Sequence, residues 1–193
     1  MRITILILLT NFIFSGYVSA QIDDDRMIYR EVLQKLLNEV EINGRGEKVK
    51  MLVIRTKYED FSIWGTSSLS DKKYNLDSVM IKDFENMIYT LTRECHSRYL
   101  NEVLKNEKNV VLLSEKEFSK FFGRNFWKKF YRKYPHSNGW TFISPITYNP
   151  EHTVALLFYE AQAHYLVGEG CFVICIKSDD KWIVKDIIMY MQS

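Results

Sequence analysis

The first half of the chain places apolar and polar residues mainly with the period of a helix. After three aspartates at residues 23–25, apolar side chains recur every third or fourth position as far as Val40. This spacing predicts an amphipathic helix whose acidic amino end suits the helix dipole. A second helical pattern covers residues 79–105, and strand-like runs lie before and after it at residues 48–58 and 109–113.

The next segment combines a helical period with many aromatic residues. Ser114 and Glu117 have the spacing of a capping box, in which each side chain bonds the backbone N–H of the other residue, so a helix is expected to begin there. It should continue to Tyr134, because Pro135 keeps the residue before it out of the helical region. Gly123 is expected to bend or split this helix.

The last third of the chain changes to the period of strands. Short turns separate the apolar runs, and connections this short require antiparallel neighbours. Helices followed by a meander of strands predict an α+β fold, with N-terminal helices packed on a curved antiparallel sheet of four or more strands. The expected strands are residues 140–147, 153–162, 166–177 and 182–191.

Phe118 to Met191 contains the chain's most distinctive short motifs, namely FWKKFYRKYPHSNGW, ISPITYN, TVALLFY, GEGCFVICIK and DDKWIV. This region resembles a group of exported bacterial proteins of unknown function, in which a YP-S-G segment introduces a strand and G-x-G and K-W steps belong to a closing hairpin. The resemblance implies structure and carries no active residues over. The closing hairpin also resembles the curved sheets of nuclear-transport-factor-like and cystatin-like folds, although the helix before the strands departs from the simplest version of that fold.

The first twenty residues have the three-part build of a secretory signal peptide. A positive start at Arg2 precedes an apolar run, and Val18 and Ala20 occupy the two positions that a signal peptidase reads. The run is shorter than the roughly 20 residues that span a bilayer. We therefore expect a signal peptide at residues 1–20, export to the periplasm or the extracellular space, and a single α+β domain at residues 21–193 without a membrane span.

The composition is that of a chain that folds around a core. Hydrophobic residues make up 47% of the chain, while Gly (8) and Pro (3) are few, so long regular elements are expected. Cys171 and Cys175 lie four residues apart on a predicted strand, a separation of about 13 Å that no disulfide spans. A bridge from Cys95 to either one stays open, beside the interpretation that all three are buried thiols.

One face of the segment from Thr153 to His164 turns from apolar to polar along its length. Glu160 and His164 share this face, and Glu169 lies between two glycines across the hairpin. If the sheet curls around a cavity, these three groups could perform acid–base chemistry at its mouth. The alternative is a strand end that meets water and, at Glu169, a bulge at a plain sheet edge.

Other catalytic and metal-binding patterns are missing from the sequence. It contains no C-x-x-C, H-E-x-x-H or G-x-S-x-G motif, and its four histidines cannot be assigned to a nucleophile from sequence alone. We expect no cofactor and no metal, and enzyme activity is unsupported rather than excluded.

The distribution of charge gives a further indication of function. The chain has 26 basic and 24 acidic residues, so its net charge says nothing about partners. Between Glu117 and Glu151, however, there is no acidic residue at all. The basic residues of the predicted aromatic helix 118–134 are Lys120, Arg124, Lys128, Lys129, Arg132 and Lys133.

This basic helix predicts a binding or interaction module with a surface for an anionic partner: a glycan, a lipid head group or an acidic protein, and not nucleic acid. Lys120, Arg124 and Lys128 are expected to form one exposed stripe. The phenylalanines expected in the core beside it are Phe122, Phe126 and Phe130. The alternatives are a merely solvated helix face and a small exported enzyme, hydrolase- or isomerase-like, with an acid–base site in the sheet cavity.

Overall fold

The computed structural model describes residues 21–38, 50–55, 78–94, 100–104 and 107–192. The predicted signal peptide, both ends of the expected strand 48–58, and Cys95 lie outside these ranges.

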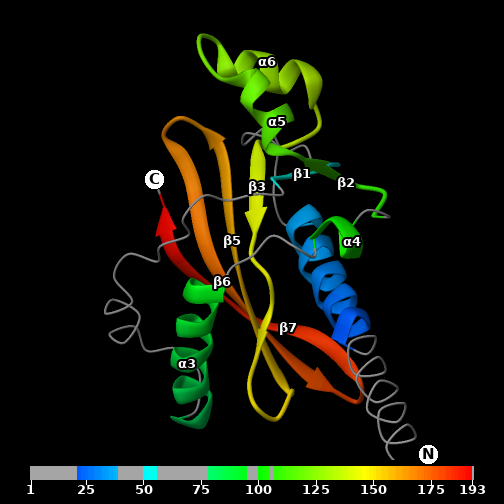
Figure 1. Cartoon of the computed structure of the whole chain (residues 1–193), viewed down its shortest axis with the longest axis vertical. Coiled ribbons are helices and arrows are strands. Elements are labelled where there is room, and N and C mark those ends of the chain that lie inside the picture. Colours follow the sequence, from blue (N-terminus) through cyan, green and yellow to red (C-terminus); the bar gives the residue numbers. More distant parts are fainter. Residues whose placement is uncertain (1–20, 39–49, 56–77, 95–99, 105–106, 193) are drawn as a thin grey trace, which may run out of the picture.

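Within the described residues, seven strands form one open, curved sheet in the order β2-β1-β3-β5-β6-β7, with β4 paired to β5 (Figure 1). The strands are β1 (Leu52–Arg55), β2 (Val110–Leu113), β3 (Trp140–Ile143), β4 (Thr147–Tyr148), β5 (Val154–His164), β6 (Val167–Ser178) and β7 (Lys181–Gln192). β3 to β7 pair antiparallel, whereas β1 pairs in parallel with both β2 and β3. The expected α+β class, with helices mainly first and a curved, mostly antiparallel sheet last, is confirmed.

The sheet is buried on both faces, so alternate residues of each central strand enter two different cores. Residues 21–38 form a helix that packs with α4 (Leu100–Leu104) on one face. The other face is covered by α3 (Ser78–Glu94) and by three short elements, α5 (Glu115–Phe118), η2 (Ser119–Phe121) and α6 (Phe126–Lys133). Along β5, Leu156 and Phe158 belong to the α3 side, while Leu157 and Tyr159 belong to the side of the 21–38 helix.

The predicted strand 140–147 is divided in two by Ser144 and Pro145. The carbonyl of Ser144 accepts a hydrogen bond from the Tyr29 hydroxyl at 2.8 Å. The backbone N–H of Phe158 donates instead to the Ser144 hydroxyl at 2.9 Å. Pro145 has no backbone N–H and cannot continue the ladder. The buried hydrogen bond from Tyr29 to Ser144 ties the 21–38 helix to the middle of the sheet.

Two hairpin turns end the long strand β6, and they differ sharply in chemistry. At the β6–β7 turn, Asp179 and Asp180 have positive φ angles of 48° and 60°, the conformation of a type I′ turn that aspartate tolerates. At the β5–β6 turn, the two connecting residues are Tyr165 and Leu166. Beside Glu169 the pairing of β6 with β7 shifts register between Gly170 and Cys171, but the extra residue is Tyr190 of β7, so the bulge expected in the glycine-flanked strand lies on its partner strand.

Candidate functional site

The predicted basic helix is two helical pieces separated by a sharp loop. The capping box is confirmed at its start: the Ser114 hydroxyl accepts from the Glu117 N–H at 3.4 Å, and Glu117 accepts from the Ser114 N–H at 3.2 Å. Helical structure then stops after Phe121, since Gly123 has a φ of 91° and Asn125 a left-handed φ of 67°. The expected split at Gly123 is confirmed.

This loop corrects the predicted stripe of Lys120, Arg124 and Lys128. Lys120 lies in η2, Arg124 in the loop and Lys128 in α6, so the three do not share one side of one helix. All six basic residues are nevertheless exposed. We call Lys120, Arg124, Lys128, Lys129, Arg132 and Lys133 the basic surface.

The helix α6 has two opposed faces. Its buried or half-buried residues are aromatic: Phe126, Trp127, Phe130, Tyr131 and, at the C-cap, Tyr134. Its exposed residues are Lys128, Lys129, Arg132 and Lys133. At 3.6 residues per turn, each set fits within roughly 140° of the helix circumference. The aromatic face anchors α6 on the sheet, and the whole opposite face is left to the cations.

The aromatic face packs as a continuous group of rings. Phe130 is fully buried and contacts the ring of Phe121 at 5.4 Å between centroids and that of Tyr134 at 5.2 Å. Phe126 is 8% exposed. Phe122 is 57% exposed, which corrects its expected place in the core. It lies in the loop, where its ring contacts those of Phe118 and Phe126 from the solvent side.

Arg55 of β1 joins α5 to the sheet. Its guanidinium lies 4.0 Å from the ring centroid of Phe118 and bonds Glu115 at 3.0 Å. Glu117 faces the basic surface: its hydrogen bonds from Ser114 lower its pKa first, and the charges of Lys133 and Lys120 lower it further. The few acids beside the basic surface are thus at its edge, in the first turn of α5.

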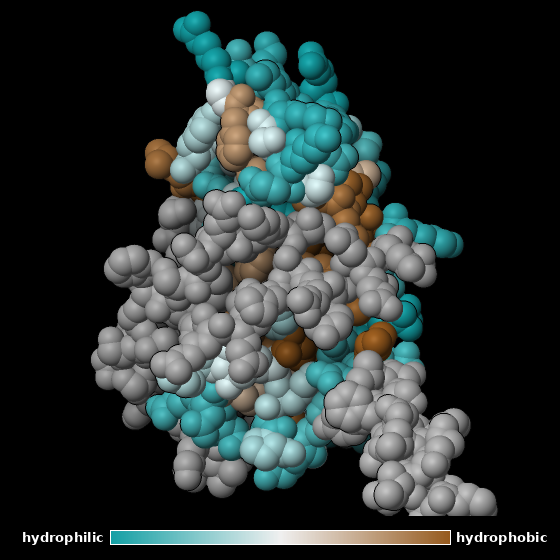
Figure 2. Space-filling view, in the orientation of Figure 1, coloured by the Kyte–Doolittle hydropathy of each residue, from teal (hydrophilic) through white to brown (hydrophobic). Residues whose placement is uncertain are grey.

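The β5–β6 turn lies against α6. The Tyr131 hydroxyl donates to the carbonyl of Ala163 at 2.6 Å. The ring of Trp127 stacks on His164 at 5.8 Å and meets Tyr165 edge-on at 6.1 Å. The basic surface and this turn therefore form one end of the molecule. In Figure 2 this end is mostly hydrophilic, with hydrophobic atoms at the margin on the side of the β5–β6 turn in Figure 1.

The three acid–base candidates do not meet at one cavity. Glu160 lies on the same face of β5 as Phe158, and pairs with Gly170 across the hairpin. Glu169 shares the face of Cys171, which is opposite to that of Glu160, and there it accepts a hydrogen bond from the Tyr159 hydroxyl at 3.3 Å. His164 is exposed at the end of β5 on the ring of Trp127.

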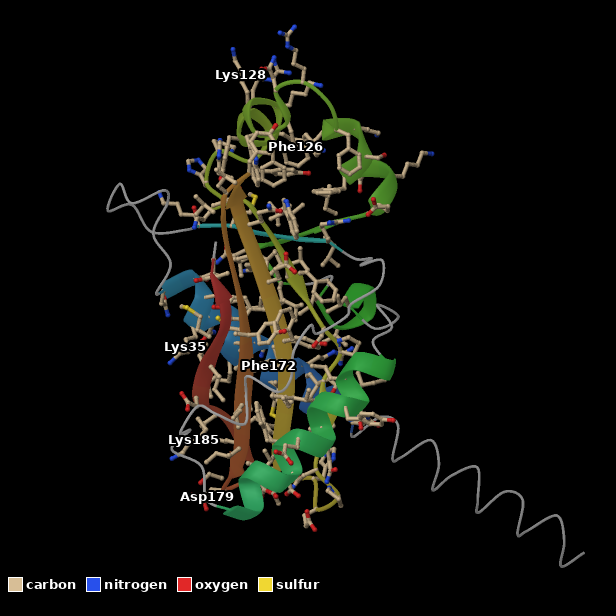
Figure 3. The ribbon with its side chains drawn as sticks, turned by 90° about the vertical axis from the view of Figure 1, so that its left-hand side faces the viewer. Lys35, Phe126, Lys128, Phe172, Asp179 and Lys185 are labelled. Carbon is tan, nitrogen blue, oxygen red and sulfur yellow. The ribbon has the colours of Figure 1, made fainter. Side chains whose placement is uncertain are left out.

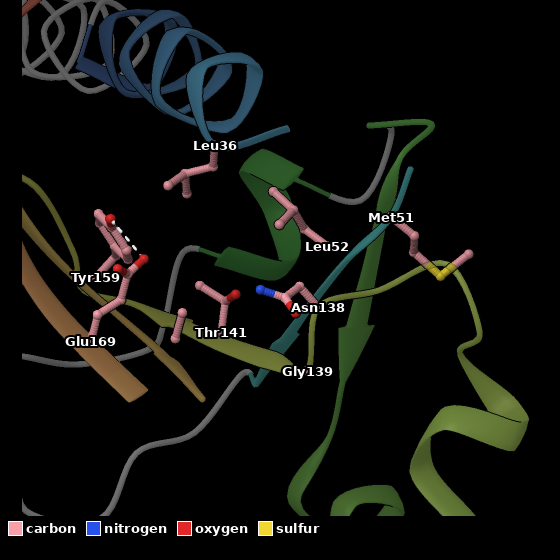
Figure 4. Close-up of a pocket in the computed structure, with 9 residues that line it drawn as sticks. Leu36, Met51, Leu52, Asn138, Gly139, Thr141, Tyr159 and Glu169 are labelled. Atoms are coloured by element: carbon pink, nitrogen blue, oxygen red, sulfur yellow. Dashed lines mark hydrogen bonds between the residues drawn. The ribbon is translucent and has the colours of Figure 1, made fainter. Parts of the chain in front are cut away.

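A small pocket lies beside Glu169 (Figure 4). Leu36 of the 21–38 helix, Asn138, Thr141 and Tyr159 line it with Glu169. Its cavity volume of about 30 Å³ is enough for one or two water molecules. Burial raises the pKa of Tyr159 and of the neighbouring Cys171 thiol, so neither group is prepared to ionise at neutral pH.

A cluster of polar groups at the other end of the sheet was not predicted. Asp24 in the first described turn of the 21–38 helix bonds His152 at 3.0 Å and Lys177 at 3.2 Å. Burial alone would raise the pKa of Asp24, but the Trp182 indole, Lys177 and His152, in that order, lower it below its ordinary value. Burial raises the pKa of Asp25 to about 6, and its carboxylate accepts from the Tyr148 hydroxyl.

The only sequence signal for this cluster was the acidic run 23–25, which was interpreted as a helix start. His152 sits in a turn with a left-handed φ of 55° and is more than a hundred residues away along the chain, so no local spacing joins it to Asp24. The contacts tie the helix end to the β4–β5 turn. Among the described residues, no serine or cysteine nucleophile bonds Asp24 or Asp25.

Within the part of the chain that the structure describes, no group of three or more His, Cys, Asp or Glu side chains could hold a metal ion. None of the described helices is long and apolar enough to cross a bilayer. Cys171 and Cys175 are buried free thiols, and burial raises the pKa of Cys175 to about 12.

Comparison with known proteins gives no guide to this site, because the chain matches no protein-family model, no curated protein and no solved structure. The resemblance to exported bacterial proteins stays a prediction.

Proposed function

We propose that the protein is a binding module that holds an anionic partner on its basic surface. One observation carries the proposal: α6 turns only aromatic rings inward and only Lys128, Lys129, Arg132 and Lys133 outward. A solvated helix face usually mixes charges of both signs. The exposed face of α6 carries positive charges only, and the sequence around it has no acidic residue from Phe118 to Pro150.

The partner's chemistry follows from the surface and from the predicted export. Lysine and arginine side chains offer several donors to phosphate, sulfate or carboxylate groups. Outside the cytoplasm such groups belong to anionic glycans, lipid head groups or acidic proteins. The attraction between exposed charges is screened over about 8 Å at physiological ionic strength, so binding should weaken steadily as salt rises.

An enzyme with an acid–base site in the sheet cavity has less support. It needs Glu160, His164 and Glu169 at one cavity, whereas these side chains lie apart and only Glu169 lines the pocket. The pocket beside Glu169 has room for water and not for a substrate of ordinary size.

The test replaces the outward charges of α6 and leaves its aromatic face unchanged. The variant Lys128→Gln/Lys129→Gln/Arg132→Gln should elute from a sulfated polysaccharide matrix at clearly lower salt than the native protein. Its melting temperature should hardly change, because exposed substitutions alter stability by about 0.5 kcal/mol or less.

The matched control removes three exposed lysines elsewhere, Lys108→Gln/Lys181→Gln/Lys185→Gln. Lys185 lies at the opposite end of the molecule from Lys128 (Figure 3). The control has the same total charge as the α6 variant. An equal fall in elution salt for both variants would refute the proposal, since net charge and not the basic surface would then explain retention.

A further inference from the structure

The β5–β6 turn exposes three consecutive large apolar residues. Tyr165 is 60% exposed, Leu166 81% and Val167 55%. Single exposed apolar residues are ordinary on protein surfaces, but Leu166 is the most exposed large hydrophobic residue in the described part of the chain. Turns normally use Gly, Asn or Asp, as the β6–β7 turn does with its two aspartates. Neither the geometry of the turn nor packing in the core explains why these three residues are apolar. We call Tyr165, Leu166 and Val167 the apolar tip.

The apolar tip has a fixed position relative to the cations. Trp127 and Tyr131, which contact the turn, lie at one edge of the aromatic face of α6. The exposed residues that follow them around the helix are Lys128 and Arg132, each about 100° from the aromatic residue directly before it in the sequence. Lys133 lies on the other side, 5.8 Å from the ring centroid of Phe121. Among the cations of α6, Lys128 and Arg132 are therefore the nearest to the apolar tip.

From this arrangement we infer that the anionic partner is the surface of a lipid bilayer. Leu166 and Val167 insert at the boundary of the head groups and acyl chains, Tyr165 lies at head-group level, and Lys128 and Arg132 contact anionic head groups. The inference rests on the proposed function and adds the identity of the partner.

The physical reason for choosing a bilayer is that the tip and the cations need different surroundings. Peripheral membrane proteins bind by apolar burial together with attraction to anionic lipids, and aromatic rings with a polar group favour the interface. A soluble anionic glycan would satisfy the cations but would leave Leu166 in water. An acidic protein would have to offer an apolar hollow as well. A bilayer supplies an anionic layer for the cations and an apolar layer for Leu166.

The test measures co-sedimentation with vesicles of phosphatidylglycerol and phosphatidylcholine in equal parts, against vesicles of phosphatidylcholine alone. The native protein should bind the anionic vesicles and bind the neutral ones far less. Leu166→Asn should weaken binding to anionic vesicles by about tenfold, the order expected for losing one buried leucine. Its retention on the sulfated matrix should be unchanged. The control Ile183→Asn removes an exposed apolar residue on β7 and should bind vesicles like the native protein.

The outcomes separate this inference from the proposed function. Vesicle binding by Leu166→Asn equal to that of the native protein would overturn the inference. So would a native protein that is retained on the matrix but does not bind anionic vesicles, because its partner would then be a soluble anion. If the triple glutamine variant of α6 loses neither matrix retention nor vesicle binding, the proposed function itself is wrong.

Discussion

Phe122 and Phe130 offer a matched test of how the basic end is built, because the same residue type occupies an exposed and a buried position eight residues apart. Phe130 is fully buried and contacts five other aromatic rings. Phe122 is 57% exposed and contacts two. Truncating each to alanine removes the same atoms, so a difference in stability measures the difference in packing.

The expected magnitudes follow from burial. Phe130→Ala should lower the free energy of unfolding by about 3 to 5 kcal/mol, as for other buried phenylalanines, with the lost aromatic pairs favouring the upper half. Phe122→Ala should cost about 1 kcal/mol or less, since more than half of the ring already meets water. Urea unfolding followed by far-UV circular dichroism would measure both, with equal slopes required for the comparison. Equal losses for the two variants, or a loss under about 1.5 kcal/mol for Phe130→Ala, would refute this description of α6.

Two further predictions concern a close backbone approach and a buried carboxyl group. Gly139→Ala should destabilise the protein by about 3 kcal/mol or more, because a Cβ there would lie 1.9 Å from the carbonyl oxygen of Gln162. The control is Gly123→Ala, which has a similar positive φ but open space around it and should cost about 1 kcal/mol. Thermal melts would measure both changes. Burial raises the pKa of Asp25 to about 6, above its unfolded value near 3.9. The folded state therefore holds the proton of Asp25 more tightly than the unfolded state does. Protonated Asp25 stabilises the fold below about pH 4, and this stabilisation of about 3 kcal/mol is lost as the pH rises to about 6. Asp25→Asn should remove that decline in urea titrations at several pH values, and an unchanged decline would assign it to another group.

The parts of the fold that the sequence predicted are those with local causes. The capping box at Ser114 depends on two side chains three residues apart, and the split at Gly123 on one backbone conformation. The hairpins from β5 to β7 depend on short turns that leave only antiparallel pairing. Each of these could be inferred without knowing what lies on the other side of the sheet.

The parts that could not be predicted depend on contacts between distant segments. β1 pairs in parallel with β2 and β3, and nothing in its four residues indicates these partners. The bond from Tyr29 to Ser144 joins residues 115 positions apart. The Asp24–His152 contact likewise has no sequence pattern, because neither residue belongs to a motif with the other.

The basic residues of the candidate site were predicted from the sequence, but part of their predicted arrangement was wrong. The basic residues could be found from the acid-free stretch, but their division between η2, the loop and α6 could not. The apolar tip was overlooked, because Leu166 fits equally well as the first residue of a strand, where an apolar side chain needs no explanation. Its assignment to the basic end depends on its exposure and on the contact of the neighbouring Tyr165 with Trp127 of α6.

The charge distribution along the long axis also bears on how the molecule would approach a surface. Asp179 and Lys185 both lie toward the end far from α6 (Figure 3), so charges of both signs occur there. At the α6 end, Lys128 and its exposed neighbours are of one sign. A molecule whose net charge is near zero gains little from non-specific attraction, but an uneven distribution still orients it in the field of an anionic surface. Because Tyr165 of the β5–β6 turn contacts Trp127 of α6, an orientation that turns this end of the molecule toward such a surface would bring the turn close to the surface as well.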